Sequence, residues 1–117
     1  DLNKTYKGIA ASSGNSFVHE TESQVILNGS YNINFTMDLV KKDMNLFDQL
    51  SKKLNTELEI SPFVLNIFKE AEKKFGSRAW SSMVVKRLEE KYNINFRALG
   101  FPEELIDNEP EEKGYEI

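Results

Sequence analysis

The chain contains no cysteine and one histidine, His19, among its 117 residues. Without cysteine it forms neither disulfide bonds nor a catalytic thiolate, and the composition favours a reducing compartment, so we expect a cytoplasmic protein. One imidazole supplies too few nitrogen and sulfur ligands for a transition-metal site, and we expect no bound metal. On a predicted helix, His19 is expected to be a surface or hydrogen-bonded core residue rather than a catalytic group.

Long hydrophobic runs and an excess of positive charge are also missing. No apolar run reaches the roughly 20 residues that a membrane-spanning helix needs. The net charge is −4, and lysines occur in scattered pairs balanced by glutamates, which argues against binding to a phosphate backbone. We therefore expect neither a membrane nor a nucleic acid as partner. The apolar and charged fractions, 39% and 29%, are typical of a soluble globular domain with a single core.

What the sequence does contain is helical periodicity. Apolar residues recur at three- and four-residue spacing in one long stretch and predict an amphipathic helix from about Thr36 to Leu54. The members of this stripe are Met37, Val40, Met44, Phe47, Leu50 and Leu54, widened by Leu39 and Leu46. Asp43 falls inside the apolar arc, and Lys42 points toward its rim.

Other start and stop signals predict further helices. A serine followed by proline suggests that a helix begins at Ser61 and Pro62, and its apolar residues cover more than one face, so we expect it to be the most buried element. The first predicted helix ends near Ala11. The next three run from Ser16 to about Leu27, from about Thr36 to Leu54 and from Ser61 to Gly76, and a fifth begins with Ser77 as its cap. No convincing alternating strand is found. The prediction is an all-α, compact multi-helix bundle.

The composition divides the chain into three parts. Residues 1–92 are predicted to form the helical domain, residues 93–107 a partly docked tail, and residues 108–117 an acidic mobile tail. The chain begins at Asp1 without a methionine and runs directly into a segment that reads as a helix. We therefore expect it to be a piece of a longer protein.

Asp43 is the candidate that most needs an explanation. An ionised carboxylate on a buried helix face is costly unless a cation or a hydrogen-bond donor meets it. Asp43 is either an acid at the edge of the face, solvated or paired locally, or the partner of a cation from an element outside this chain. Lys42 is correspondingly either a solvated lysine or a ligand-binding one, and Phe35 either packs on the helix start or contacts a ligand.

Two sequence blocks resemble a known family. Residues 13–17 read Ser-Gly-Asn-Ser-Phe and residues 34–44 read Asn-Phe-Thr-Met-Asp-Leu-Val-Lys-Lys-Asp-Met. With the Ser61 helix and the segment from Gly76 to Trp80, they are similar to the C-terminal domain of the β-hydroxyacid dehydrogenases. That family, which includes 3-hydroxyisobutyrate dehydrogenase, tartronate semialdehyde reductase and glyoxylate/succinic semialdehyde reductase, has Ser-Gly-x-Ser-Trp and then Gly-Phe-x-x-x-Leu-x-x-Lys-Asp-Leu. The resemblance extends from Asp1 to about Glu90, with Phe17, Asn34 and Lys41 as departures from the pattern.

The resemblance implies a fold and a reaction. The chain would be the C-terminal helical domain of a 6-phosphogluconate-dehydrogenase-like enzyme, without its N-terminal Rossmann domain, which carries the dinucleotide. Lys42 would contact the cofactor, NAD or NADP, and Asp43 would pair with a catalytic lysine located upstream. Phe35 would pack beside a small 3-hydroxyacid or semialdehyde substrate. The isolated chain would be inactive, and the enzyme would be a homo-oligomer.

A different function also fits the residues. The chain has more aromatic residues than a small bundle requires for its core. Such a surplus is typical of a stand-alone helical protein–protein interaction module, which exposes apolar side chains to a partner. Tyr31, Phe47, Phe63, Phe68 and Trp80 motivate this alternative.

Overall fold

The computed structural model describes residues 1–105 and residue 114, and this part of the chain is helical. The elements in order are α1 (Leu2–Ala10), α2 (Phe17–Asn28), α3 (Met37–Lys53), α4 (Ile60–Phe75), the 3₁₀ helix η1 (Ser81–Val85) and α5 (Lys86–Tyr92). Two isolated bridges are the β-type pairings found there. The all-α prediction is confirmed. Most of the predicted mobile tail, residues 108–117, lies outside the described residues.

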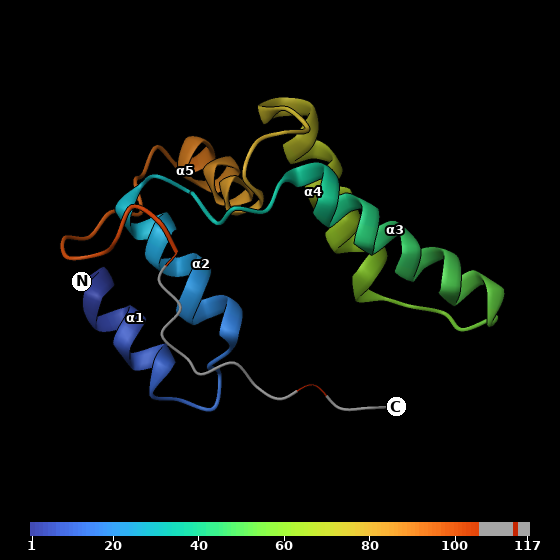
Figure 1. The fold of residues 1–117 in the computed structure, drawn as a ribbon, viewed down its shortest axis with the longest axis horizontal. Coiled ribbons are helices and arrows are strands. Elements are labelled where there is room, and N and C mark those ends of the chain that lie inside the picture. Colours follow the sequence, from blue (N-terminus) through green and yellow to red (C-terminus); the bar gives the residue numbers. More distant parts are fainter. Residues whose placement is uncertain (106–113, 115–117) are drawn as a thin grey trace.

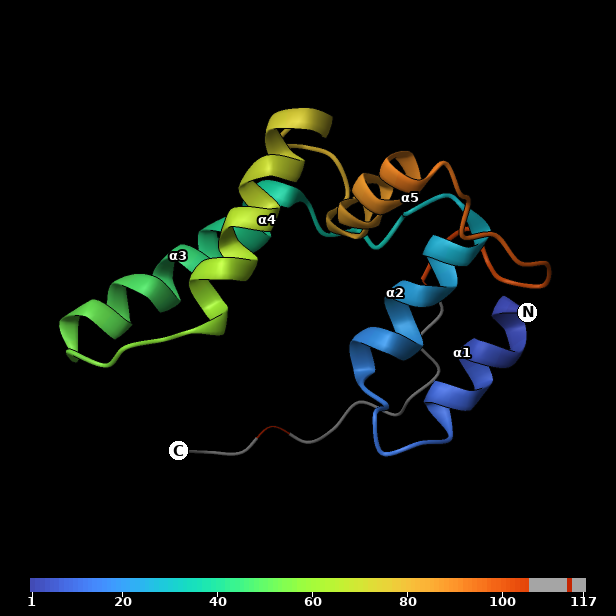
Figure 2. The same ribbon diagram turned by 180° about the vertical axis from the view of Figure 1, so that it is seen from behind.

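The helices form two antiparallel pairs joined by a short central element. α1 packs on α2 and α3 packs on α4, as both faces of the ribbon show (Figures 1 and 2). η1 contacts α2, α4 and α5, and so connects the two pairs. Within the described residues, no helix combines the length and the hydrophobicity that crossing a bilayer requires.

α2 begins and ends where its local signals predict. The Ser16 hydroxyl oxygen accepts a hydrogen bond from the amide of His19 at 3.0 Å, as a helix N-cap does. After Asn28, Gly29 takes a left-handed conformation with φ of +94° and closes the helix. Both ends therefore follow from residues within the helix or next to it.

α3 also has the predicted extent, but its apolar stripe is not buried along its length. Met37, at the first turn, is fully buried, whereas the side chain of Phe47 is 65% exposed and Leu50 and Leu54 are also exposed. The expectation that this stripe is buried is therefore wrong. Leu50 and Leu54 are exposed, and Phe47 borders an open hollow that Ile60 and Val64 of α4 also line.

α4 differs from its prediction in two ways. It begins at Ile60, after Glu59, and Ser61 makes no capping hydrogen bond but lies inside the first turn. Only Leu65 and Ala71 are buried in this helix, and Phe63 is 67% exposed. The predicted Ser61 cap and the predicted central position are therefore both wrong. α4 packs mainly on α3 and η1, and ion pairs from Glu70 to Arg87 and from Lys74 to Glu90 also connect it to α5.

The segment after Gly76 is not a helix capped by Ser77. The Ser77 carbonyl oxygen accepts the amide of Asp38 at 3.0 Å, and the Ala79 carbonyl oxygen accepts the amide of Met37 at 2.9 Å. These carbonyl oxygens bond to the start of α3 and not within a helix. Locally the segment forms a turn, in which the Ala79 amide donates to the Gly76 carbonyl oxygen at 3.2 Å. Helical structure resumes at Ser81 as η1 and continues as α5.

Residues 93–105, called the strap below, lie beside the C-terminal end of α2. The amide of Ala98 donates to the carbonyl oxygen of Leu27 at 3.0 Å, and the side-chain amide of Asn28 donates to the carbonyl oxygen of Phe101 at 3.1 Å. The Phe101 ring meets the Tyr6 ring edge to face, with 5.1 Å between the centroids. The strap therefore connects α5 back to the α1–α2 pair.

Candidate functional site

The site residues suggested by the sequence lie at the entry to α3 and on its first turns. The connector from α2, residues 31–36, includes Asn34 with φ of +58°. This is the position at which the resembled pattern has glycine, and asparagine is among the side chains that best tolerate the left-handed region. The departure at Asn34 thus preserves the backbone turn.

Phe35 is held by its backbone. Its carbonyl oxygen accepts a hydrogen bond from the amide of Ser81 at 2.8 Å, and the next residue, Thr36, pairs with Trp80 in an isolated antiparallel bridge. The Phe35 side chain is 37% exposed, so part of the ring remains open to solvent. The ring is therefore presented at a fixed point beside the N-terminus of α3.

Asp38 stabilises this entry. It accepts hydrogen bonds from the Thr36 hydroxyl and from the Arg78 guanidinium, the latter at 3.0 Å. The Thr36 hydroxyl and then Arg78 lower the pKa of the Asp38 carboxyl below its ordinary value. Asp38 also places a negative charge in the first turn of α3, where the helix dipole favours it. Its contacts are structural, and the sequence alone did not single it out.

Lys42 and Asp43 are both exposed and form an ion pair with each other. The Lys42 Nζ lies 2.9 Å from the Asp43 carboxylate, and the two side chains are 60% and 55% exposed. The expectation that Asp43 lies on a buried face is wrong within the described residues, because nothing there packs over it. Adjacent helix residues point about 100° apart and water screens both charges, so this pair contributes little to stability.

The two adjacent lysines of α3 are not equivalent. Lys41 forms an ion pair with Glu72 of α4 and is half-buried between the helices. Lys42 lies one residue further around the helix, away from α4, with its amine in solvent. Lys42 is therefore the lysine that is available to a ligand.

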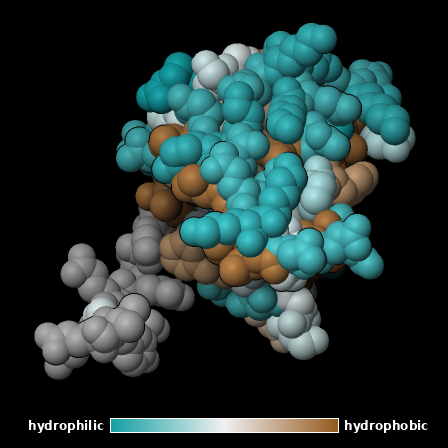
Figure 3. Space-filling view, turned by 90° about the vertical axis from the view of Figure 1, so that its right-hand side faces the viewer, coloured by the Kyte–Doolittle hydropathy of each residue, from teal (hydrophilic) through white to brown (hydrophobic). Residues whose placement is uncertain are grey.

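Asp43 lies in the middle of an uncovered apolar face. At about 100° per residue, the side of α3 that packs on α4 carries Met37, Met44 and Lys41, and another side about a third of a turn away carries Asp43. We call this second side the open face of α3; it consists of Leu39, Asp43, Leu46, Phe47, Leu50 and Leu54, of which the last four are exposed apolar residues. Figure 3, which views the end of the molecule where the α3–α4 hairpin lies, shows hydrophobic surface among hydrophilic side chains.

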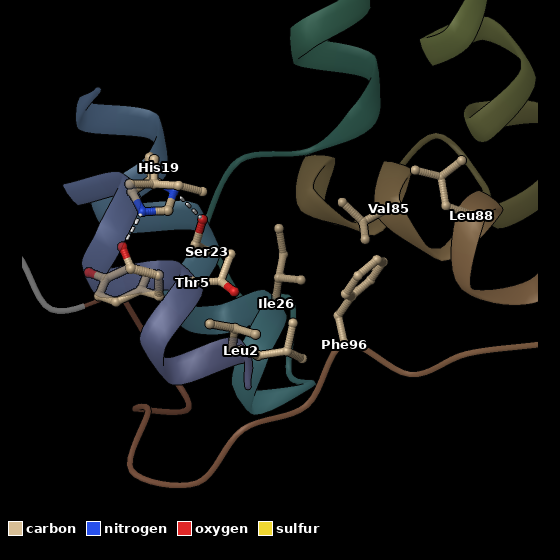
Figure 4. A pocket seen from close by; sticks show the side chains of 11 residues that line it. Leu2, Thr5, His19, Ser23, Ile26, Val85, Leu88 and Phe96 are labelled. Carbon is tan, nitrogen blue, oxygen red and sulfur yellow. Dashed lines mark hydrogen bonds between the residues drawn. The ribbon is translucent and has the colours of Figure 1, made fainter. Parts of the chain in front are cut away.

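A second apolar region lies between α1, α2 and α5. It is an open groove of about 330 Å³, lined by Leu2, Thr5, Tyr6, Ile9, His19, Ser23, Ile26, Leu27, Val85, Leu88 and Phe96 (Figure 4). His19 lies at one end, with Nε2 3.0 Å from the carbonyl oxygen of Tyr6 and Nδ1 3.2 Å from the Ser23 hydroxyl. Since a carbonyl only accepts, Nε2 carries the proton and the Ser23 hydroxyl donates to Nδ1. Both ring nitrogens are thus satisfied.

Tyr31 and Glu89, which are buried, form a cluster with the partly exposed Arg97. This cluster is called the clasp below, and no sequence signal for it was found. The Tyr31 hydroxyl donates to Glu89, and Arg97 donates to Glu89 at 2.7 Å and to the Tyr31 hydroxyl oxygen at 2.7 Å. Burial alone would raise the pKa of Glu89, but the hydrogen bonds from Tyr31, the Phe96 amide and Arg97 outweigh it, and the pKa is lowered. Tyr31 lies 58 and 66 positions before the other two residues, which is why no local pattern predicts the cluster.

Metal ligands are not gathered anywhere in the described residues. No group of three or more histidine, aspartate and glutamate side chains lies close enough together there to hold an ion.

Comparison with known families gives one match. A family model described as NAD-binding of NADP-dependent 3-hydroxyisobutyrate dehydrogenase matches residues 1–88. This range contains α1 to η1 together with Phe35, Lys42 and Asp43, and it stops one residue before Glu89. None of the curated proteins compared with the chain matches it.

Proposed function

The chain belongs to the family described as NAD-binding of NADP-dependent 3-hydroxyisobutyrate dehydrogenase, and on this basis we propose that it is the C-terminal helical domain of a dinucleotide-dependent dehydrogenase. A Rossmann domain before Asp1 would bind NAD or NADP. The helical domain would complete the active-site cleft for a small 3-hydroxyacid or the corresponding semialdehyde. The enzyme would belong to the group of 3-hydroxyisobutyrate dehydrogenase, tartronate semialdehyde reductase and glyoxylate/succinic semialdehyde reductase.

The observation that carries this proposal is the position of Asp43 on the open face of α3. An apolar helix face is stabilised by being covered, and covering this one removes water from the Asp43 carboxylate. A buried carboxylate is tolerated when a cation meets it with good geometry. The covering element is therefore expected to be apolar and to carry a lysine opposite Asp43, as the catalytic lysine on a preceding helix would be.

Asp43 would then hold that lysine in place. A carboxylate next to an ammonium group favours the charged form and keeps a proton on the lysine nitrogen. A lysine held in this way can give a proton to the substrate oxygen during reduction and take it back during oxidation. The weak contact between Asp43 and Lys42 is easily exchanged for this stronger one, since both side chains are more than half exposed.

Lys42 would contact the cofactor. The dinucleotide, when bound, supplies the hydride acceptor or donor. The Lys42 amine fits this role because it is exposed at the rim of the open face, on a helix whose backbone is fixed, and a charge-assisted hydrogen bond to an anionic or carbonyl oxygen orients a ligand. Phe35 would provide an apolar wall beside the substrate, at the position that the Ser81 amide fixes.

The test compares two aspartates of α3 in the protein expressed with the preceding Rossmann segment. The readout is oxidation of 3-hydroxyisobutyrate with NADP⁺ or NAD⁺. Asp43→Asn is expected to lower kcat by roughly 100-fold or more, since it removes the partner of the proton-transfer group. Asp48→Asn is the matched control, because Asp48 is also ion-paired on α3, to Lys52 at 2.7 Å. Equal losses in both variants, or turnover by residues 1–117 alone, would contradict the proposal.

A stand-alone interaction module is the second candidate, and the same surface favours it. The exposed apolar residues of the open face would then bind a partner protein rather than a preceding helix of the same enzyme. In the dehydrogenase we also expect a homo-oligomer, because helical faces left uncovered in one subunit are commonly covered by another. Because Asp43 is exposed in the isolated chain under both candidates, the activity of Asp43→Asn in the protein with its Rossmann segment separates them.

A further inference from the structure

Tyr31, the first residue of the connector, has an unusual backbone. Its φ is +56°, in the left-handed region that aromatic residues rarely adopt. Such a conformation persists only where the surrounding structure over-determines it. The Tyr31 side chain is buried, and its carbonyl oxygen accepts a hydrogen bond from the Ser82 hydroxyl at 2.7 Å. Contacts to both its backbone and its side chain therefore hold this residue in place.

The clasp supplies the side-chain contacts. The Tyr31 hydroxyl is both donor, to Glu89, and acceptor, from Arg97. The Arg97 guanidinium also lies 5.1 Å from the centroid of the Tyr31 ring, within cation–π range. Glu89 is 5% exposed and has its charge balanced by Arg97. Removing Arg97 would leave a buried carboxylate short of its cation and would release the tyrosine hydroxyl.

The other end of the connector is fixed by the residue next to Ser82. The amide of Ser81 donates to the Phe35 carbonyl oxygen at 2.8 Å, while the Ser82 hydroxyl holds Tyr31. The two ends of the connector thus meet at the start of η1. A backbone change at Tyr31 would shift the point from which Phe35 and the first turn of α3 are presented.

We propose that Glu89 and Arg97 are positioning residues, which hold the connector through the Tyr31 hydroxyl and thereby fix the location of Phe35. Both lie beyond residue 88, where the family match ends, so the end of α5 and the strap add a support that the matched region does not contain. The consequence for substrate binding rests on the proposed function. The coupling between Arg97 and the connector does not depend on the proposed function, and it can be measured without any assay of activity.

The test is amide hydrogen exchange on the whole chain, comparing Arg97→Met with wild type. The informative amides are those of Phe96 and Ala98 in the strap and that of Ser81, which is bonded to Phe35. We expect exchange at all three to become roughly 10- to 100-fold faster, while the amides of α4 keep their rates. Arg87→Met is the matched control, because Arg87 forms its ion pair with Glu70, at 3.1 Å, and not with Glu89. It should change none of the three rates.

Two results would overturn the proposal. Acceleration confined to Phe96 and Ala98 would show that the strap loosens without moving the connector. Equal acceleration throughout α4 would show a general loss of stability. If Arg97→Met does not fold, Tyr31→Phe is measured by the same criteria, since it keeps the buried ring and removes only the hydroxyl. The proposed dehydrogenase function can fail while these exchange rates still change as expected, so the two failures are distinguishable.

Discussion

The guanidinium of Arg97 passes directly over Gly29, the residue that ends α2. A Cβ atom at Gly29 would lie 2.4 Å from the Arg97 Nε, well inside contact distance. Glycine is therefore required here twice, once for its φ of +94° and once for the approach of the arginine to Tyr31 and Glu89. The C-terminal end of α2 and the clasp therefore pack closely against each other.

Gly29→Ala is expected to destabilise the chain by about 3 kcal/mol, from the left-handed backbone and from displacement of Arg97 together. Gly100→Ala is the control, because Gly100 has φ of +88° but a Cβ atom added there would have no neighbour within 4 Å. That variant should lose only about 1 kcal/mol. Urea unfolding of both chains checks the difference, and equal losses would contradict the close packing at Gly29.

Asp43→Asn tests whether Asp43 has a stabilising partner within the chain. If Asp43 awaits a lysine from outside the chain, the substitution should leave the free energy of unfolding of residues 1–117 unchanged within about 0.5 kcal/mol or raise it, since the Lys42 contact is exposed. Thermal unfolding measures this, with Asp48→Asn as the comparison. A clear decrease confined to Asp43→Asn would indicate an internal partner and would contradict the role proposed for Asp43.

Lys42→Gln is expected to weaken cofactor binding. In the protein with its Rossmann segment, KM for the dinucleotide should rise roughly tenfold through loss of one charge-assisted hydrogen bond. Lys52→Gln, on the same helix and paired with Asp48, should leave KM unchanged. Initial-rate kinetics at varied cofactor concentration make the comparison, and an unchanged KM in Lys42→Gln would remove this lysine from the site.

The clasp should make the effect of Arg97 depend on pH. The folded-state pKa of Glu89 lies below its ordinary value of 4.5, so its contribution to stability is complete above about pH 4.5 and is lost as the pH falls through the folded pKa. The destabilisation caused by Arg97→Met should therefore be largest near pH 7 and should shrink toward pH 3. Glu22, whose pKa burial raises, acts in the opposite direction but equally in both proteins. A pH-independent difference would exclude charge pairing as the source.

The open face of α3 should promote self-association of the isolated chain. Phe47→Ser is expected to reduce association and to leave stability nearly unchanged, because the side chain is largely exposed. Phe63→Ser is matched in exposure but lies on α4, and it should not affect association. Light scattering over a concentration series distinguishes the two variants. A wild-type chain that is monomeric at every concentration would contradict self-association through the open face.

Some features followed from the sequence because they depend on neighbouring residues. Ser16 and Gly29 set the ends of α2 through hydrogen bonds and a backbone angle within one turn. The spacing of apolar residues likewise defined α3 to within a residue at each end. The two motif blocks led to the family that the match over residues 1–88 shows. These are short-range properties, so the order of residues along the chain contains all the information they need.

Other features were decided only by the tertiary structure. Ser61 and Ser77 have the composition of helix caps, but α4 begins earlier and Ser77 bonds to the start of α3 instead. Periodicity could show that α3 is amphipathic, yet only the position of α4 determines that Asp43 and Leu50 lie on an uncovered side. The clasp joins residues separated by 58 and 66 positions in the chain. Such contacts depend on how distant segments pack, and no local pattern of side chains encodes them.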